Sequence, residues 1–205
     1  MMKTADFEKK FKNYHHGIMD IRGEYAVLVP LVEDGGETCI LYELRSKTID
    51  VQPNEVCFPG GGFEPGENAI ECALRETEEE IGVSSDRIEI ISELDSLHPA
   101  SGLLLHPVLG VIKNYSRDIL QLNSAEVGDV FTVPVSKLAE EPYIYHGGYI
   151  QEPNDDFPYE RMGITKGYRW RSVRSDVVLY ECAPYPIWGL TAMVTYWLMR
   201  KMGDK

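Results

Sequence analysis

The chain has 205 residues, 43% of them hydrophobic, and a formal net charge of -13. This length suits one domain with an ordinary core, and the acidic balance argues against sequence-independent nucleic-acid binding, which needs a basic surface. The cysteines are widely spaced and form no paired metal motif, which indicates reduced, structural thiols in the cytoplasm. They are Cys39, Cys57, Cys72 and Cys182.

Residues 1–22 carry mixed charges and no long apolar run, so they predict a short helix or an arm, and neither a signal peptide nor a membrane span. Residues 23–203 are expected to form a single domain. His15 and His16 are adjacent, and neighbouring side chains diverge in any regular element, so we do not expect them to bind a metal together.

Strand and helix signals alternate through the domain and predict an α/β fold with a mixed sheet. Residues 25–32 and 38–44 are rich in β-forming side chains and flank Asp34-Gly35-Gly36, which predicts an antiparallel hairpin. The residues 142–167 are rich in Pro, Gly and Asp and are expected to form an insertion or a mobile loop. Further strands are expected at 88–94, 103–112, 127–133 and 177–182, and helices at 69–81, 136–140 and 187–199.

The predicted helix at 69–81 has defined ends. Asn68, with Glu71 three residues later, approximates a capping box, and Gly82 suits the left-handed residue that ends a helix. A narrow stripe of four side chains is expected to be its buried face. These are Ile70, Leu74, Thr77 and Ile81.

Three carboxylates lie on a separate sector of the same helix. Successive residues rotate by about 100°, so Glu76, Glu79 and Glu80 fall within one sector of roughly 100° and can reach a common point. A solvated acidic face is one interpretation, and a site for a hard cation such as Mg²⁺ is the other. The glutamates repel one another and no Lys or Arg is interleaved with them, which favours the cation.

The spacing of charged residues and glycines from Gly61 to Val83 resembles the Nudix box, G-x5-E-x7-R-E-U-x-E-E-x-G-U, with U an aliphatic residue. Every charged and glycine position matches. The one departure is Thr77, whose methyl group is expected to lie against the core at a small packing cost. The resemblance implies a Nudix-type α/β/α sandwich with a catalytic loop-helix-loop and a C-terminal packing helix. It also implies Mg²⁺- or Mn²⁺-dependent hydrolysis of a nucleoside diphosphate linked to another moiety.

The same resemblance assigns roles to the residues of the box. Arg75 is expected to hold a box glutamate in place, and Glu67 to bind metal indirectly or brace the loop. The catalytic base is left open between a box glutamate and an acid from a distant loop, such as Glu126, Asp155 or Asp156. The expected metal ligands are Glu76, Glu79, Glu80 and the carbonyl group of Gly61. The expected catalytic residues are Arg75, Glu76 and Glu79.

Residues before the box resemble the signature of coenzyme A pyrophosphatases, L-L-T-x-R-[SA]-x3-R-x3-G-x3-F-P-G-G. Leu41, Arg45, Ser46 and the FPGG segment at 58–61 match at the right spacing. This resemblance implies cleavage of coenzyme A or acyl-coenzyme A to 3′,5′-ADP and (acyl-)4′-phosphopantetheine. The expected substrate contacts are Arg45, Ser46, Gly60 and Gly61.

Four residues depart from this signature: Tyr42, Glu43, Asp50 and Asn54. Asp50 places an acid where the signature has a base, which favours an alternative substrate such as ADP-ribose, a dinucleotide or another nucleotide sugar. A non-catalytic nucleotide-sensing module is a third alternative. Asn54 replaces a glycine and is expected to adopt the left-handed conformation.

Other side chains near the predicted site keep two interpretations. Arg45 binds an anion or is a surface charge paired with Glu43 or Glu55, and Phe58 is expected to fill the core. The later aromatic residues line a ligand pocket or form a core of their own. They are Tyr143, Tyr145, Tyr149, Phe157, Tyr159, Tyr168 and Trp170. The expected partner is a small nucleotide, without nucleic acid or membrane, and a homodimer is left open.

Overall fold

The structure is a computed structural model that describes residues 2–15, 17–99, 101–140, 142–150, 157–165 and 167–203. Three residues weighed above as ligands or bases, His16, Asp155 and Asp156, lie outside these ranges.

A mixed sheet forms the centre of the fold. Strands β1 (Gly23–Asp34) and β2 (Glu37–Arg45) are antiparallel, which confirms the predicted hairpin. β6 (Leu103–Ile112) runs parallel to β1, and β5 (Ile88–Glu93) lies antiparallel to β6 at the edge. The strand order is therefore β3-β2-β1-β6-β5.

Two short strands fill the gap that opens as β1 and β2 diverge: β3 (Val56–Cys57) pairs with β2, and β4 (Gly60–Gly62) pairs with β1. The glycine strand β4 thus lies beside the beginning of β1. β7 (Val127–Pro134) pairs with the opposite edge of β2. Three short helical elements complete this part of the chain: η1 (Ser85–Arg87), η2 (Arg117–Ile119) and α3 (Val135–Leu138).

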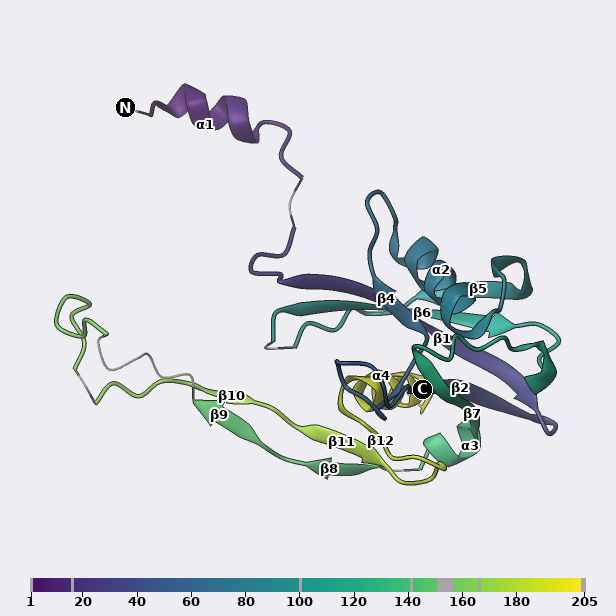
Figure 1. Cartoon of the computed structure of the whole chain (residues 1–205). Coiled ribbons are helices and arrows are strands. Elements are labelled where there is room, and N and C mark those ends of the chain that lie inside the picture. Colours follow the sequence, from purple (N-terminus) through teal and green to yellow (C-terminus); the bar gives the residue numbers. More distant parts are fainter. Residues whose placement is uncertain are drawn as a thin grey trace.

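Helices cover both faces of the sheet and make three layers (Figure 1). Because side chains alternate along a strand, Ala26 and Leu28 of β1 belong to the apolar cluster beneath α2 (Ala69–Ile81). Val29 of β1 belongs to the cluster beneath α4 (Gly189–Gly203). The predicted α/β/α sandwich with a C-terminal packing helix is confirmed.

The C-terminal helix begins later than predicted. Ile187–Trp188 is a strand, β12, which pairs with β11 (Val177–Tyr180), and only then does α4 begin. Gly189 has a φ of 66°, a left-handed conformation that lets the chain turn from strand to helix. Apolar side chains alone could not distinguish a buried strand from the first turn of a buried helix.

A long ribbon extends from the side of the domain beneath α4 (Figure 1). It contains β8 (Tyr143–Tyr145), which pairs with β11, and β9 (Gly148–Ile150), which pairs with β10 (Ser172–Arg174). Its mobility stays a prediction. Of the aromatic residues discussed above, four contact one another edge to face and form a small cluster of their own. They are Phe157, Tyr159, Tyr168 and Trp170.

Helix α1 (Thr4–Phe11) lies in the region predicted to be a helix or an arm. It stands away from the sheet (Figure 1), and none of its residues is buried.

Candidate active site

Arg75 on α2 gathers the acidic residues of the glycine-rich loop and the helix. Its Nε donates to Glu67 Oε1 at 2.7 Å, and its Nη1 donates to Glu76 Oε1 at 2.8 Å and to Glu79 Oε2 at 3.3 Å. These charge-assisted hydrogen bonds lower the pKa of Glu67 to about 2, with the bond from Arg75 as the largest cause. Arg75 therefore orients three carboxylates at once.

The helix that carries these residues has the predicted ends. Asn68 accepts from the backbone N–H of Glu71, the Glu71 side chain accepts from the backbone N–H of Asn68, and Gly82 has a φ of 72°.

The predicted separation between a packed face and a carboxylate face of α2 is only partly correct. Thr77 and Ile81 are buried as predicted, and Ile70 and Leu74 pack half-buried against the core, but Glu80 is only 5% exposed. The reason is that α2 packs on β4, a strand of glycines without side chains, so small residues and Glu80 fit against it. The buried residues of α2 are Ala69, Cys72, Ala73, Thr77, Glu80 and Ile81.

Glu80 points toward the glycine-rich segment. Its Oε2 accepts from the backbone N–H of Gly60 at 2.8 Å. Burial, followed by repulsion from the nearby Glu43 carboxylate, raises the pKa of Glu80 well above its usual range. Burial also raises the pKa of Glu76, although Arg75 opposes the effect. The surroundings therefore disfavour the charged forms of Glu76 and Glu80.

The three box glutamates are expected to reach a common point, but their side chains turn in two directions. Glu76 and Glu79 both accept from Arg75, whereas Glu80 accepts from the backbone N–H of Gly60. Within the described ranges, no three His, Cys, Asp or Glu side chains are placed closely enough to hold a metal ion. Like charges repel, so each carboxylate takes the nearest hydrogen-bond donor. Metal ligation by these residues and by Gly61 stays a prediction.

The two glycines before the helix are closely packed. A Cβ on Gly60 would lie 2.6 Å from the backbone Cα of Val27, and a Cβ on Gly61 would overlap the carboxylate of Glu76. Gly60 needs glycine because backbone atoms approach it directly, whereas at Gly61 only the end of the Glu76 side chain would have to move.

Thr77, the departure from the family pattern, is fully buried, and its hydroxyl donates to the Ala73 carbonyl at 2.6 Å. Thr77→Val removes this bond without leaving a buried donor unpaired, because the hydroxyl goes with it. We expect the free energy of unfolding to change by less than about 1 kcal/mol and turnover to be unchanged. Urea denaturation and steady-state assays check both, and a large loss of turnover would contradict the assignment of Thr77 to packing.

Two of the predicted substrate contacts, Arg45 and Ser46, lie at the end of β2, and the other two, Gly60 and Gly61, lie in β4. The Arg45 guanidinium donates to the Val51 carbonyl at 3.3 Å, and it forms no ion pair with any residue in the described part of the chain, so the alternative pairing with Glu43 or Glu55 is absent there. Ser46 is buried, and its hydroxyl lies 2.8 Å from that of Thr48. Binding of substrate by these side chains stays a prediction.

The departures from the signature occupy different environments. Asn54 has a φ of 59°, which confirms the expected left-handed conformation, and Asp50 is exposed. Phe58 is 3% exposed and stacks on Tyr42 at 5.0 Å between ring centroids, so it is a core residue as predicted.

Glu43 belongs to the acidic cluster, whereas the sequence predicts it only as a departure from the signature and as a candidate ion-pair partner of Arg45. It is 1% exposed, and its Oε1 accepts from the Cys57 thiol at 3.1 Å. A signal was present, because a glutamate at this strand position follows Cys39 and Leu41, which face the core beneath α2. Of the candidate bases, Glu126 is exposed and lies close enough to raise the pKa of Glu76 and Glu80.

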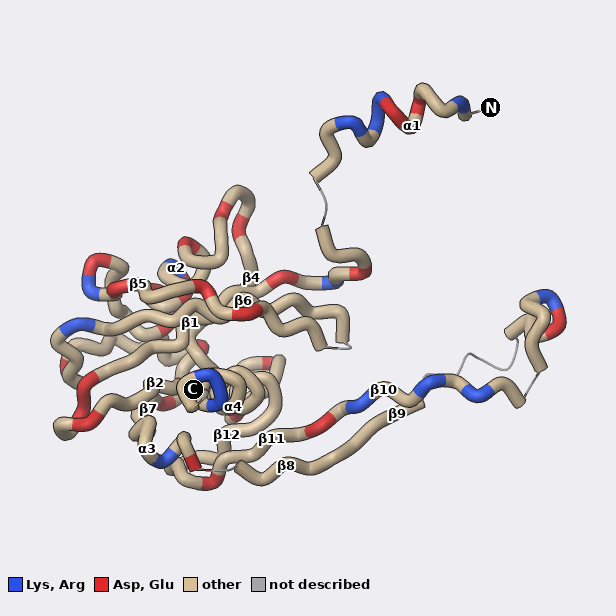
Figure 2. The backbone as a smooth tube through the Cα atoms, turned by 180° about the vertical axis from the view of Figure 1, so that it is seen from behind, with Lys and Arg blue, Asp and Glu red and all other residues tan. Residues whose placement is uncertain are grey.

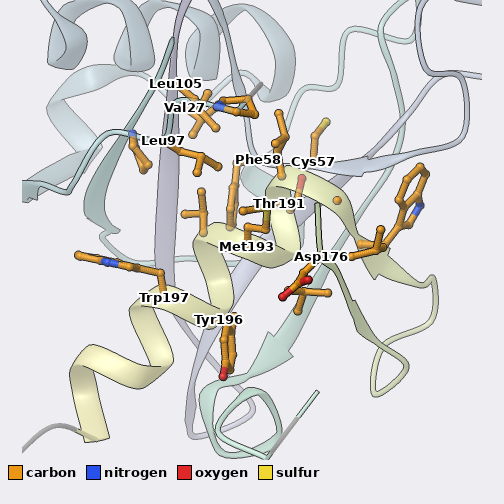
Figure 3. A pocket seen from close by; sticks show the side chains of 18 of the residues that line it. Val27, Cys57, Phe58, Leu97, Leu105, Asp176, Thr191, Met193, Tyr196 and Trp197 are labelled. Carbon is orange, nitrogen blue, oxygen red and sulfur yellow. The ribbon is translucent and has the colours of Figure 1, made fainter. Parts of the chain in front are cut away.

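A cavity of about 1340 Å³ opens on the α4 side of the sheet. Apolar and aromatic side chains from the sheet and α4, including Phe58 and Trp197, line it (Figure 3). Glu76, Glu79 and Glu80 do not line it, but Cys57 and Arg45 do, so the cavity reaches the strand that contacts Glu43.

Side chains of both charge signs line this cavity. The basic ones are Arg45, Arg174, Arg200 and Lys201, and the acidic ones are Glu55, Asp95 and Asp176, of which Asp176 pairs with Arg174. Figure 2 shows basic residues on β10 and at the end of α4, whereas acidic residues are frequent around α2 and β1. The cavity thus places basic groups next to a strongly acidic region.

Fold and site together define a Nudix-type α/β/α sandwich with a glutamate-bearing helix after a glycine-rich strand. Residues 23–149 match the family described as NUDIX domain. The chain belongs to the Nudix family, a family of pyrophosphohydrolases.

Proteins with similar sequences carry related names. Nudix hydrolase 3 of Caenorhabditis elegans is 39% identical over 124 residues, 60% of this chain and 52% of that protein. Peroxisomal coenzyme A diphosphatase NUDT7 of Mus musculus is 33% identical over 135 residues, 65% of this chain and 56% of that protein. The chain thus spans about half the length of these two relatives. The uncharacterized Nudix hydrolase NudL of Photorhabdus laumondii is 27% identical over 208 residues, 98% of this chain and 99% of that protein.

Among solved structures, the MutT/nudix family protein from Enterococcus faecalis superposes with a TM-score of 0.54 at 15% identity. The match covers 100% of this chain and 71% of that chain, and it supports the fold alone. No helix in the described ranges is both long and apolar enough to cross a membrane.

Proposed function

We propose that the chain hydrolyses a nucleoside diphosphate linked to another moiety, with Mg²⁺ or Mn²⁺ as cofactor. The observation that carries this proposal is the acidic cluster of α2 beside the glycine strand β4, where Glu76 and Glu80 have raised pKa values. Buried carboxylates without sufficient counter-charge fit a hard divalent cation. Every carboxylate of the family motif is present, which argues against a module that has lost catalysis.

The residues of the cluster suit separate tasks. Glu76, Glu79 and Glu80 would hold the cation together with the Gly61 carbonyl. When bound, the ion would neutralise pyrophosphate charge and lower the pKa of a coordinated water. Arg75 keeps Glu76 and Glu79 in position through its hydrogen bonds. A box glutamate or Glu126 would accept the proton of the attacking water.

Coenzyme A or acyl-coenzyme A is the proposed substrate. The name of the mouse relative supports it, as do the matching Leu41, Arg45 and Ser46. The cavity has room for a large ligand, because pockets for small molecules commonly measure about 300–1,000 Å³, and Arg45 with Lys201 supplies positive charge for phosphate groups. ADP-ribose, a dinucleotide or another nucleotide sugar is the second candidate, and Asp50 is the residue that favours it.

A substrate panel tests this proposal. The full chain with Mg²⁺ or Mn²⁺ is given coenzyme A, acetyl-coenzyme A, ADP-ribose and a dinucleotide, and mass spectrometry identifies the products. We expect 3′,5′-ADP and the corresponding 4′-phosphopantetheine compound from the first two. Fast turnover of ADP-ribose without release of 3′,5′-ADP from coenzyme A would establish the second candidate instead.

Arg45→Ala is expected to raise the KM for coenzyme A by about tenfold or more, because a charge-assisted hydrogen bond contributes about 1.5–3 kcal/mol. Initial-rate measurements over a range of substrate concentrations check this. Lys47→Ala is the matched control, since Lys47 is exposed, lies two residues away and does not line the cavity. Equal KM values for the two variants would show that Arg45 does not bind the substrate.

The compartment and the oligomeric state are also part of the proposal. All four cysteines are free thiols, which supports a reducing compartment such as the cytoplasm. A homodimer stays a prediction that sedimentation equilibrium of the purified chain will check.

A further inference from the structure

Glu43 is an unusual residue for its position. It lies two residues before the end of β2, is 1% exposed, and follows the core residues Ile40, Leu41 and Tyr42. Its Oε1 accepts a weak hydrogen bond from Cys57, whereas its Oε2 is buried without a hydrogen-bond partner among the described residues. A buried carboxylate in this state is costly unless a positive charge reaches it.

Glu43 faces the same layer as the box glutamates. Side chains alternate along β2, so Glu43 shares the α2 side of the sheet with Leu41. The segment from Cys57 to Gly60 contacts both acids, because Cys57 donates to Glu43 and Gly60 donates to Glu80. Each of the two carboxylates, Glu43 and Glu80, therefore accepts a hydrogen bond from this segment through one oxygen.

The electrostatics agree with this placement. Burial raises the pKa of Glu43, and Glu126 and Glu76 raise it further. Arg45 opposes the shift, but its guanidinium donates to the Val51 carbonyl and forms no ion pair with Glu43. The unpartnered oxygen thus belongs to a cluster of acids, and no cationic side chain in the described ranges pairs with it.

We propose that Glu43 is an additional carboxylate ligand of the divalent-cation site formed with Glu80. This inference rests on the proposed function, because it adds a ligand to the cation site of that reaction. The signature of coenzyme A pyrophosphatases has threonine at this position. A carboxylate ligand at Glu43 would therefore distinguish this chain from proteins that match the signature. The additional oxygen takes the place of a water on the ion and increases the negative charge of the site.

Direct measurement of Mn²⁺ binding tests the role of Glu43. Free Mn²⁺ is quantified by electron paramagnetic resonance in titrations of the full chain and of Glu43→Gln, Glu43→Thr and Glu37→Gln. Glu37 is the matched control because it lies on the same strand and is exposed. We expect the first two variants to weaken Mn²⁺ binding by about tenfold or more, and the control to bind as the unmodified chain does.

A second measurement separates ligation from a structural role. Melting curves are recorded in EDTA and in saturating Mn²⁺. Glu43→Gln is expected to melt in EDTA at the same temperature as the unmodified chain or higher, since it removes a buried charge, and to gain less stability from Mn²⁺. A lower melting temperature in EDTA, with the full gain from Mn²⁺ retained, would make Glu43 a structural residue and overturn the inference.

The remaining outcomes are also distinct. Unchanged Mn²⁺ affinity in Glu43→Gln, with substrate hydrolysis intact, would overturn the role of Glu43 alone, because a neutral isostere would then serve as well as the carboxylate. Absence of Mn²⁺ binding and of hydrolysis by the unmodified chain would overturn the proposed function together with this inference.

Discussion

Glu80→Gln is expected to lower turnover at least about 100-fold while the protein stays folded. Mutation of an outer-shell residue of a metal site typically lowers metal affinity or activity by about 10–100-fold, and mutation of a direct ligand should lower them at least as much. Folding should persist because the amide oxygen of glutamine can still accept from the Gly60 N–H that Glu80 now binds. Steady-state assays with the preferred substrate measure kcat, and circular dichroism measures the melting temperature.

The control for this variant lies on the same helix. Glu78 is exposed, so Glu78→Gln changes the charge of α2 by the same amount outside the cluster and should retain turnover. If both variants kept turnover within about twofold of the unmodified chain, Glu80 would not be a ligand, and its burial would serve packing alone.

Gly61→Ala is expected to lower kcat by about tenfold or more with little change in melting temperature. The new methyl group would occupy the position of the Glu76 carboxylate. The end of a glutamate side chain moves at low cost, so the fold should tolerate the methyl group, but Glu76 would leave the position in which Arg75 holds it. Misplacement of a reacting group by about 1 Å can cost about 100-fold in rate.

The neighbouring glycines provide matched comparisons. A Cβ on Gly62 would meet only the Tyr25 ring at 3.9 Å, so Gly62→Ala should keep both fold and turnover. A Cβ on Gly60 would meet the backbone of Ala26 and Val27, which cannot move aside, so Gly60→Ala should destabilise the protein. Equal turnover in Gly61→Ala and Gly62→Ala would show that the position of Glu76 does not matter for the reaction.

The elements that could be predicted were those specified by neighbouring residues. Asn68, Glu71 and Gly82 delimit α2 as expected, since caps act within one helical turn. Asp34-Gly35-Gly36 closes the β1–β2 hairpin for the same local reason, because both glycines adopt positive φ.

The errors occurred where burial depends on distant partners. Apolar side chains predict the buried stripe of α2. Packing on β4 instead buries Cys72, Ala73 and Glu80 and leaves Leu74 half-buried. The sequence predicts that residues 187–188 belong to the following helix. Their pairing with β11 as strand β12 is a tertiary contact, which a short apolar segment does not predict.

By itself, the sequence determined the family, the glutamate-bearing helix and the positions of the longer strands along the chain, because motif spacing, capping residues and side-chain periodicity are local properties. Only the tertiary structure decided that Glu80 is buried, that Arg75 joins Glu67 to Glu76 and Glu79, and that Glu43 lies in the acidic cluster. Strand register and the docking of α2 on β4 bring these groups together, and both depend on contacts between residues far apart in the chain.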